Sequence, residues 1–169
     1  MPDVSNLELA GRQIAAARQY TQTLLDGLDD ADWFRHPADS PTHIAWQVGH
    51  LAMAEYGLCL FRIRGRRPED LELMPGKFRK QFSRGSTPSP DPASYPAPVE
   101  IRRVFDTIHD RAMQEINRFD PDALNEKIEQ PYAVFDTKLG ALFFCAHHEM
   151  LHAGQIGLIR RLMGKPPIR

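Results

Sequence analysis

The sequence lacks several features that would assign a protein to a class at once. Its 169 residues include only two cysteines, Cys59 and Cys145, without the CxxC spacing of a redox or zinc motif. Each lies in an apolar stretch with helical spacing, which predicts buried free thiols in a reducing compartment. There is no run of about 20 apolar residues, and the N-terminus lacks the basic start and apolar run of a signal peptide. We therefore expect a cytoplasmic protein with no membrane partner.

An excess of charge of either sign is also missing. The formal net charge is −1, from 21 basic and 22 acidic residues, so no overall field attracts nucleic acid. We expect a small-molecule substrate and no nucleic-acid partner. The local exception is an arginine cluster at the end of a predicted helix, which complements the helix dipole or, as the alternative, binds an anion. The cluster consists of Arg62, Arg64, Arg66 and Arg67.

What the sequence does contain is a set of long stretches with apolar residues spaced three and four apart. With 42% hydrophobic and 25% charged residues, the composition is that of a globular protein, and the length suggests one domain spanning residues 1–169. The apolar spacing is typical of helices in a bundle and predicts an all-α fold. A short helix is also expected near residues 122–127, followed by an extended segment near 132–135. The four main predicted helices span residues 7–28, 41–64, 98–119 and 138–163.

The longest interruption runs from Gly65 to Ala97 and contains six prolines. We expect no helix in it, because proline removes a backbone donor and clashes with the preceding turn. A connection of about 30 residues is typical of a long crossover in a helix bundle, here between the second and third helices. Its aromatic and basic side chains either close over a site or pack as a solvated loop: Lys77, Phe78, Lys80, Phe82 and Tyr95.

Three histidines are predicted to face the core of this bundle. His148 and His152 are four residues apart, which places them one turn apart on the same helix face. His50 lies among the apolar positions of the second predicted helix. Burying imidazoles is costly unless waters and side chains satisfy their nitrogens or they hold a divalent transition metal. Three histidine ligands leave positions open for water or substrate, as in catalytic metal sites.

The letters His148-Glu149-x-x-His152 also match the zinc-protease signature, in which the glutamate acts as general base. In that class the third ligand lies downstream. The segment from Ala153 to Arg169 contains no Asp, Glu, His or Cys, which disfavours a protease. Glu149 lies about 100° from His148 on a helical wheel, so it is a candidate catalytic carboxylate only at the helix edge. Gln155, one turn beyond His152, is a second candidate, with helix–helix hydrogen bonding as its alternative role.

Two motifs and the order of the helices carry a family resemblance. The motifs are Trp46-x-x-Gly49-His50-Leu51 and His148-x-x-x-His152-x-Gly154-Gln155-Ile156, the latter followed by Arg160-Arg161-x-x-Gly164. Together with the long loop containing Gly85-Ser86-Thr87-Pro88, they make the whole chain resemble the DinB-like superfamily. The resemblance implies a four-helix bundle with a long crossover between helices two and three. It also implies a divalent metal, nickel, zinc or iron, held by His50, His148 and His152.

The same resemblance implies a thiol-dependent S-transferase or isomerase that acts on a small electrophile, with a low-molecular-weight thiol as cofactor. In that hypothesis the metal is a Lewis acid that lowers the pKa of the thiol, and the electrophile binds beside it under the proline-rich loop. Two alternatives stay open: a hydrolase that uses metal-bound water, and a non-catalytic metal-binding bundle. The resemblance also favours a homodimer.

Overall fold

A computed structural model describes residues 5–129 and 135–168, and this part of the chain is helical throughout its regular structure. Within these residues there is no β-strand, only an isolated bridge between Lys127 and Thr137. The all-α prediction is therefore confirmed. None of the described helices is long and apolar enough to cross a membrane. The α-helices are α1 (Asn6–Leu25), α2 (Ile44–Glu55), α3 (Arg62–Arg64), α4 (Asp70–Leu73), α5 (Gly76–Phe82), α6 (Pro98–Ile116) and α7 (Lys138–Leu162).

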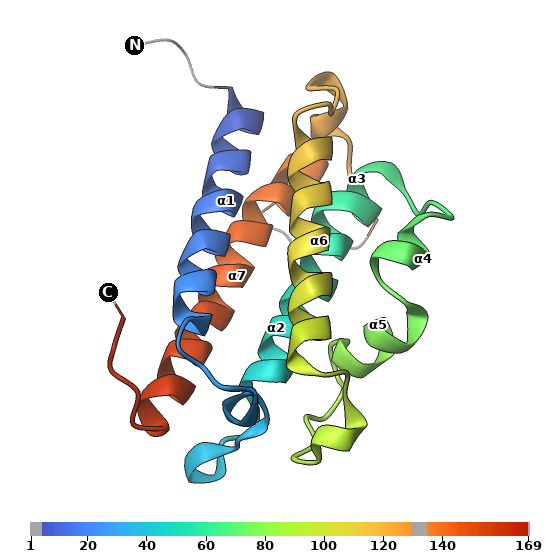
Figure 1. Cartoon of the computed structure of the whole chain (residues 1–169). Helices are drawn as coiled ribbons and strands as arrows, with labels where there is room; N and C mark the ends of the chain where they lie inside the picture. The colour runs from blue at the N-terminus through green and yellow to red at the C-terminus, as the bar shows by residue number, and fades with distance from the viewer. Residues whose placement is uncertain (1–4, 130–134, 169) are drawn as a thin grey trace.

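The longest of the described helices, α1, α2, α6 and α7, run side by side (Figure 1). α1 packs along α7, and α2 packs against both α6 and α7. The buried positions recur at the predicted spacing of three and four, and each fully buried Leu or Ile contributes about 1.5–3 kcal/mol to folding. On α6 these positions are Ile101, Val104, Phe105, Ile108, Ala112 and Ile116.

The second long helix starts later than predicted. Ser40-Pro41 suggested a start at Pro41, whereas α2 begins at Ile44 with His43 as its N-cap. The His43 ring Nδ1 accepts a hydrogen bond from the backbone N–H of Trp46 at 3.1 Å, the role that Ser or Asp usually performs. The predicted end before Gly65 is confirmed, but a π-helical segment, η3 (Tyr56–Phe61), separates α2 from α3.

The expectation of no helix between Gly65 and Ala97 is wrong. α4 and α5 form there, together with a single 3-10 turn, η4 (Pro92–Ser94). The prolines are compatible with these helices because they stand at or before a first turn, where the missing N–H has no intrahelical partner. Pro75, for example, is the N-cap of α5. α5 packs against α2, and α4 packs against α6, so the crossover is bound to the long helices.

The remaining boundaries differ little from the predicted ones. α1 and α6 each end three residues early, whereas the cap of α7 is confirmed, since Thr137 Oγ1 accepts from the N–H of Gly140 at 3.2 Å. The short helix expected near 122–127 is a 3-10 turn, η5 (Asp122–Asn125). Two further 3-10 turns, η1 (Asp30–Phe34) and η2 (Pro37–Asp39), lie between α1 and α2. Most of the predicted extended segment, residues 132–134, lies outside the described residues.

A buried arginine connects the four long helices. The guanidinium of Arg18, on α1, is 1% exposed and donates to the carboxylates of Glu55 on α2 at 2.6 Å and Glu149 on α7 at 2.8 Å. On α6 it donates to the carbonyl of Phe105 at 2.7 Å and lies 3.3 Å from the centroid of that ring. The second oxygen of Glu55 accepts from His109 Nδ1 at 2.8 Å. Buried charges need such partners, so the network holds the helices in register.

Replacing Arg18 with methionine leaves the carboxylates of Glu55 and Glu149 buried without their cation. We expect Arg18→Met to lower the free energy of unfolding by about 3–5 kcal/mol, measured by chemical denaturation. Arg12→Met, which removes an exposed pair with Glu8 on the same helix, serves as control and changes stability by less than about 0.5 kcal/mol. A loss below about 1 kcal/mol for Arg18→Met would contradict this role of the network.

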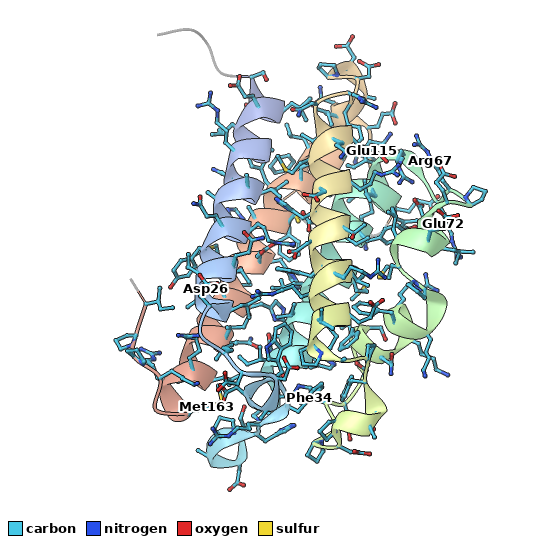
Figure 2. The ribbon with its side chains drawn as sticks, viewed as in Figure 1. Asp26, Phe34, Arg67, Glu72, Glu115 and Met163 are labelled. Carbon is cyan, nitrogen blue, oxygen red and sulfur yellow. The ribbon has the colours of Figure 1, made fainter. Side chains whose placement is uncertain are left out.

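A second ion-pair cluster anchors the start of the crossover. Arg64 donates to Asp70 at 2.8 Å and to Glu115 of α6 at 2.5 Å. Arg67 lies 3.7 Å from the same glutamate, and Figure 2 labels this pair. Asp70 also accepts from the Tyr56 hydroxyl at 2.9 Å. Arg64 therefore has a structural ion-pair role in addition to its place at the end of a helix.

This cluster predicts a loss of stability in acid. Burial by itself raises the pKa of Asp70, but hydrogen bonds from Arg64, the Arg67 N–H and Tyr56 outweigh it and lower the pKa to about 2, from an ordinary 3.8. A lowered carboxylate pKa stabilises the fold above the unfolded value, so this contribution is lost as the pH falls from about 4 to about 2. We expect wild type to lose about 1–2 kcal/mol more than Asp70→Asn across this range, measured by thermal unfolding. Parallel pH profiles for the two proteins would refute the assignment.

Candidate metal centre

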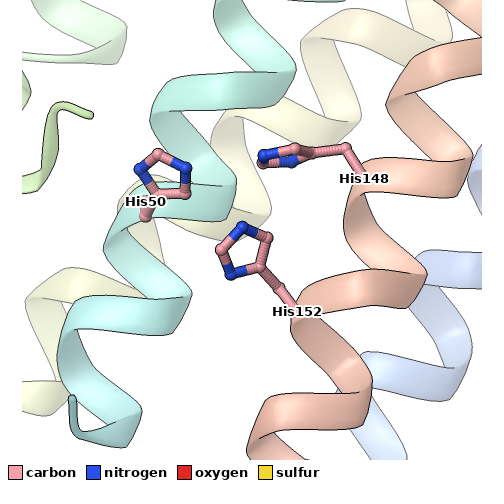
Figure 3. Close-up of side chains that lie close together, drawn as sticks. All are labelled: His50, His148 and His152. Atoms are coloured by element: carbon pink, nitrogen blue, oxygen red, sulfur yellow. The ribbon is translucent and has the colours of Figure 1, made fainter. Parts of the chain in front are cut away.

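The structure brings together the three histidines that the sequence singled out. His50 projects from α2 and His148 and His152 from α7, and the rings face one another across the gap between the helices (Figure 3). One nitrogen of each ring lies within 4.8 Å of a nitrogen of each other ring. The ring centroids are 4.5 Å apart for the α7 pair and 4.9 and 5.3 Å from His50 to His152 and His148.

His50 is oriented by the crossover. Its Nδ1–H donates to the carbonyl of Phe82, at the end of α5, at 2.8 Å. Since a carbonyl only accepts, the proton is on Nδ1 and the lone pair is on Nε2. The Phe82 ring packs directly on Gly49, where a Cβ atom would lie 2.4 Å from it. The glycine preceding His50 in the sequence motif is therefore required for the close approach of the residue that orients His50.

His152 is oriented by an amide side chain of α2. Its Nδ1–H donates to the side-chain oxygen of Gln47, and the Gln47 amide in turn donates to Thr42 Oγ1 at 3.0 Å. The amide oxygen is thereby directed at His152, and the lone pair of this ring is also on Nε2. Hydrogen bonds from the outer nitrogen of a histidine to an oxygen acceptor are the usual second layer around metal ligands.

A tryptophan supports the His50 ring from the side. Trp46 stacks on it with a centroid distance of 4.7 Å and an interplanar angle of 7°. The indole N–H donates to Ser86 Oγ at 2.9 Å, and Ser86 belongs to the Gly85-Ser86-Thr87-Pro88 segment of the crossover. Trp46 and Ser86, which both belong to segments that carry the family resemblance, thus help to hold the His50 ring in place.

All three imidazoles are neutral near pH 7. Burial lowers the pKa of His148 to about 4, with a further contribution from His50. Burial also lowers the pKa of His152 to about 3, together with the other two rings. The pKa of His50 is lowered by burial and by the charge of Arg84, against the effect of its bond to Phe82. Neutral imidazoles with an available lone pair are the form that binds metals.

These donors fit a divalent transition metal. Three imidazole nitrogens suit nickel, zinc or iron(II), and the set leaves coordination positions unfilled by protein. The three histidines line a cavity of about 840 Å³ whose other walls come from α2, α7 and the crossover. A small molecule in this cavity would therefore lie directly beside a bound ion.

The comparison with known proteins agrees with this geometry. The sequence model of the DinB superfamily matches residues 13–156, which include all three histidines and the whole crossover. The chain belongs to the DinB superfamily. None of the curated proteins compared with it matches its sequence.

The two candidate catalytic residues of this DinB-superfamily chain lie in different surroundings. Gln155 lines the cavity with the histidines, on the side that the sequence predicted. Glu149 was expected at a helix edge, but this expectation is wrong. Its side chain is 2% exposed, and both carboxylate oxygens accept hydrogen bonds from Arg18. The helical wheel placed Glu149 at the edge because it considers one helix alone, whereas α1 covers that face of α7. Its carboxylate is engaged in the interior and does not line the cavity.

A second cluster of possible metal ligands lies in the interior between the helices, and its groups are already engaged in other interactions. Ligand atoms of Glu55, Cys59 and Cys145 lie within 4.8 Å of one another. Both oxygens of Glu55 already accept hydrogen bonds. The hydrogen bond with Cys59 and burial raise the pKa of the Cys145 thiol. The same hydrogen bond lowers the pKa of Cys59, but burial and the neighbouring carboxylates together outweigh it, so that pKa is also raised. The two cysteines are buried and free, as predicted.

Sequence reasoning did not single out the residues that orient the rings. Gln47 was within reach of such reasoning, because it shares the helix face of His50 and lies three residues before it. Phe82 was not, since it acts through a backbone carbonyl that any residue type offers.

Gln47→Leu tests the orienting layer around the histidines. The leucine keeps the volume but removes the acceptor for His152 Nδ1–H, so we expect Zn²⁺ affinity to fall about 10- to 100-fold, measured by chelator competition. Gln114→Leu, at an exposed position of α6, is the control and retains wild-type affinity. Equal affinities for Gln47→Leu and wild type would show that this hydrogen bond does not prepare the site.

Proposed function

We propose that this protein is a divalent-metal-dependent enzyme that transfers a thiol sulfur to a small electrophile or isomerises a thiol adduct. Its fold would be the DinB-like four-helix bundle, with the segment from Gly65 to Ala97 as the long crossover. The observation that supports this most directly is three neutral imidazoles in the wall of a cavity of about 840 Å³, two of them, His50 and His152, oriented by hydrogen bonds.

His50, His148 and His152 would hold the metal. When bound, a divalent ion there supplies Lewis acidity that favours the thiolate form of a thiol near neutral pH. The protein's own residues set the conditions for the reaction. Phe82 and Gln47 keep the outer nitrogens of the His50 and His152 rings protonated and the inner ones free, so these two rings need no reorganisation on binding.

The rest of the cavity suits a small organic substrate. Met53, Leu58 and Phe144 contribute apolar walls that exclude water from a bound molecule. Gln155 lies in the same wall and offers an amide that can orient a substrate by hydrogen bonding. The environment of Glu149 gives no support to a protease-type mechanism, because its carboxylate is bound to Arg18.

Metal content tests the ligand set. We expect about one equivalent of Ni²⁺, Zn²⁺ or Fe²⁺ in purified, metal-supplemented wild type, measured by mass spectrometry of the elements. The variants His50→Ala, His148→Ala and His152→Ala should each retain less than about a tenth of this amount. The control is His147→Ala, an exposed histidine on the same helix, which retains full occupancy. If His50→Ala retains its metal, α2 does not supply a ligand.

Activity assays then separate the reaction classes. One screen offers the protein low-molecular-weight thiols together with small electrophiles. A second screen offers it ester and peptide substrates without any thiol. Thiol consumption that depends on the metal supports the transferase. Hydrolysis without thiol dependence would replace it with a hydrolase, and inactivity in both screens would favour a binding function.

A further inference from the structure

Another cavity lies between α1 and α7 near their C-terminal ends, where the segment after α7 turns back beside the helices (Figure 1). Its volume is about 140 Å³, which suits a single small ion rather than an organic substrate. It shares no described lining residue with the cavity beside the histidines. Arg160 and Arg161 line it, and no aspartate or glutamate of the described part of the chain does. Cations that face no acidic group in a partly enclosed space attract anions.

Arg160 is a buried cation whose partners are backbone carbonyls. It is 5% exposed, and its Nη1 donates to the carbonyls of Leu24 at 2.7 Å and Asp26 at 2.9 Å. These carbonyls lie at the C-terminal end of α1, where the helix dipole gives them a partial negative charge. No carboxylate in residues 5–129 and 135–168 forms an ion pair with Arg160. The nearby carboxylate of Asp32 is paired with Lys165 at 2.7 Å.

One edge of the Arg160 guanidinium has no hydrogen-bond partner among the described residues. Nε is buried and makes no hydrogen bond, and the hydrogen bonds of this side chain come from Nη1 alone. Nε–H and one N–H of Nη2 point the same way in the planar group, and this fork binds two oxygens of an anion. Because a buried N–H without an acceptor is costly, this edge indicates a ligand that offers oxygen acceptors.

The surrounding wall offers further donors and open space. The side chains of Tyr20 and Arg161 line the cavity and form no hydrogen bond or ion pair within the described part of the chain. On α7, a Cβ atom at Gly154 would meet nothing within 4 Å, and one at Gly157 would meet only Leu24, at 3.7 Å. The two glycines therefore leave room beside the guanidinium, and the phenol hydroxyl can donate to an anion placed there.

We propose that this cavity binds a free small oxyanion, such as phosphate or a short carboxylate, on the Nε–Nη2 edge of Arg160. Arg161 and Tyr20 supply additional charge and a further donor. The site is separate from the metal centre, because Arg160 follows His152 by eight residues, roughly 12 Å along α7. The proposal does not rest on the proposed function. It gives a ligand-binding role to the Arg160-Arg161 pair of the C-terminal motif.

The test follows the Arg160 Nε–H signal by NMR while phosphate, acetate or acetamide is added to the full-length, metal-free protein at constant ionic strength. Metal is left out because oxyanions also bind metal ions directly. Acetamide has the shape of acetate without its charge. We expect a saturable shift with at least one of the two anions, at an affinity about tenfold or more above that of acetamide.

Two results of this titration would overturn the proposal. If neither anion shifts the signal saturably at concentrations up to about 50 mM, water alone satisfies the buried N–H. Equal affinities for acetate and acetamide would show that the charge of the ligand is not recognised. A further arm uses phenyl phosphate, which should bind more weakly than phosphate because the cavity is too small for the ring. Tighter binding of phenyl phosphate would overturn the assignment to a free ion.

A variant that fills the cavity leaves the arginine in place. Gly157→Leu puts a side chain into the space beside Arg160, and leucine is compatible with a helix interior. We expect the affinity for the anion to fall about tenfold or more. The matched control is Gly76→Leu, at an exposed position of α5 with open space around it, which keeps the wild-type affinity. Unchanged affinity in Gly157→Leu would contradict the location of the site.

Arg160→Met removes the proposed anion-binding group, and its titration follows the backbone N–H signal of Gly157 instead. We expect at least a tenfold loss of affinity for the anion. Arg12→Met, at an exposed position of α1, is the control and keeps the wild-type affinity. Binding that survives in Arg160→Met would overturn the assignment. Circular dichroism checks each fold, and if Arg160→Met does not fold, the wild-type titration and Gly157→Leu still decide the proposal.

Discussion

The ion pairs of Arg18 with Glu55 and Glu149 are the constraint on which the candidate site depends. Glu55 lies five residues after His50 on the same helix, and Glu149 directly follows His148. A single guanidinium that binds both carboxylates in the interior sets the height of α2 relative to α7. Because the carboxylates are too costly to leave unpaired, a slip of one helix along the other is disfavoured. Because His50 is on the same helix as Glu55, and His148 is adjacent to Glu149, this register also fixes the histidines relative to one another.

The crossover provides the second constraint. α5 packs on α2 and ends at Phe82, whose ring sits on Gly49 while its carbonyl accepts from His50. The same segment supplies Ser86 to Trp46 and places Arg84 at the cavity. A connection that is rich in proline thus helps to form the cavity wall. Its anchoring to α6 through Arg64 explains how a long connection can hold a ring nitrogen in one orientation.

Much of the fold follows from local patterns. Apolar spacing located the four long helices, and capping chemistry placed the start of α7 at Thr137 because a threonine hydroxyl can satisfy an N-terminal amide wherever it occurs. The pattern failed at His43, where an imidazole is the cap, and in the crossover, where tertiary packing supports helices shorter than two turns. Short helices are marginal in isolation, so their presence depends on contacts that a local pattern does not contain.

The sequence by itself determined that His148 and His152 share a helix face, because their spacing and the helix pitch suffice for that. It also made His50 a candidate partner, through its apolar face and the family motif. Only the tertiary structure decided that the three rings meet, that Gln47 orients His152 and Phe82 orients His50, and that Glu149 turns inward to Arg18. These relations join atoms that are distant in the chain, and helix packing determines which of them come within hydrogen-bonding distance.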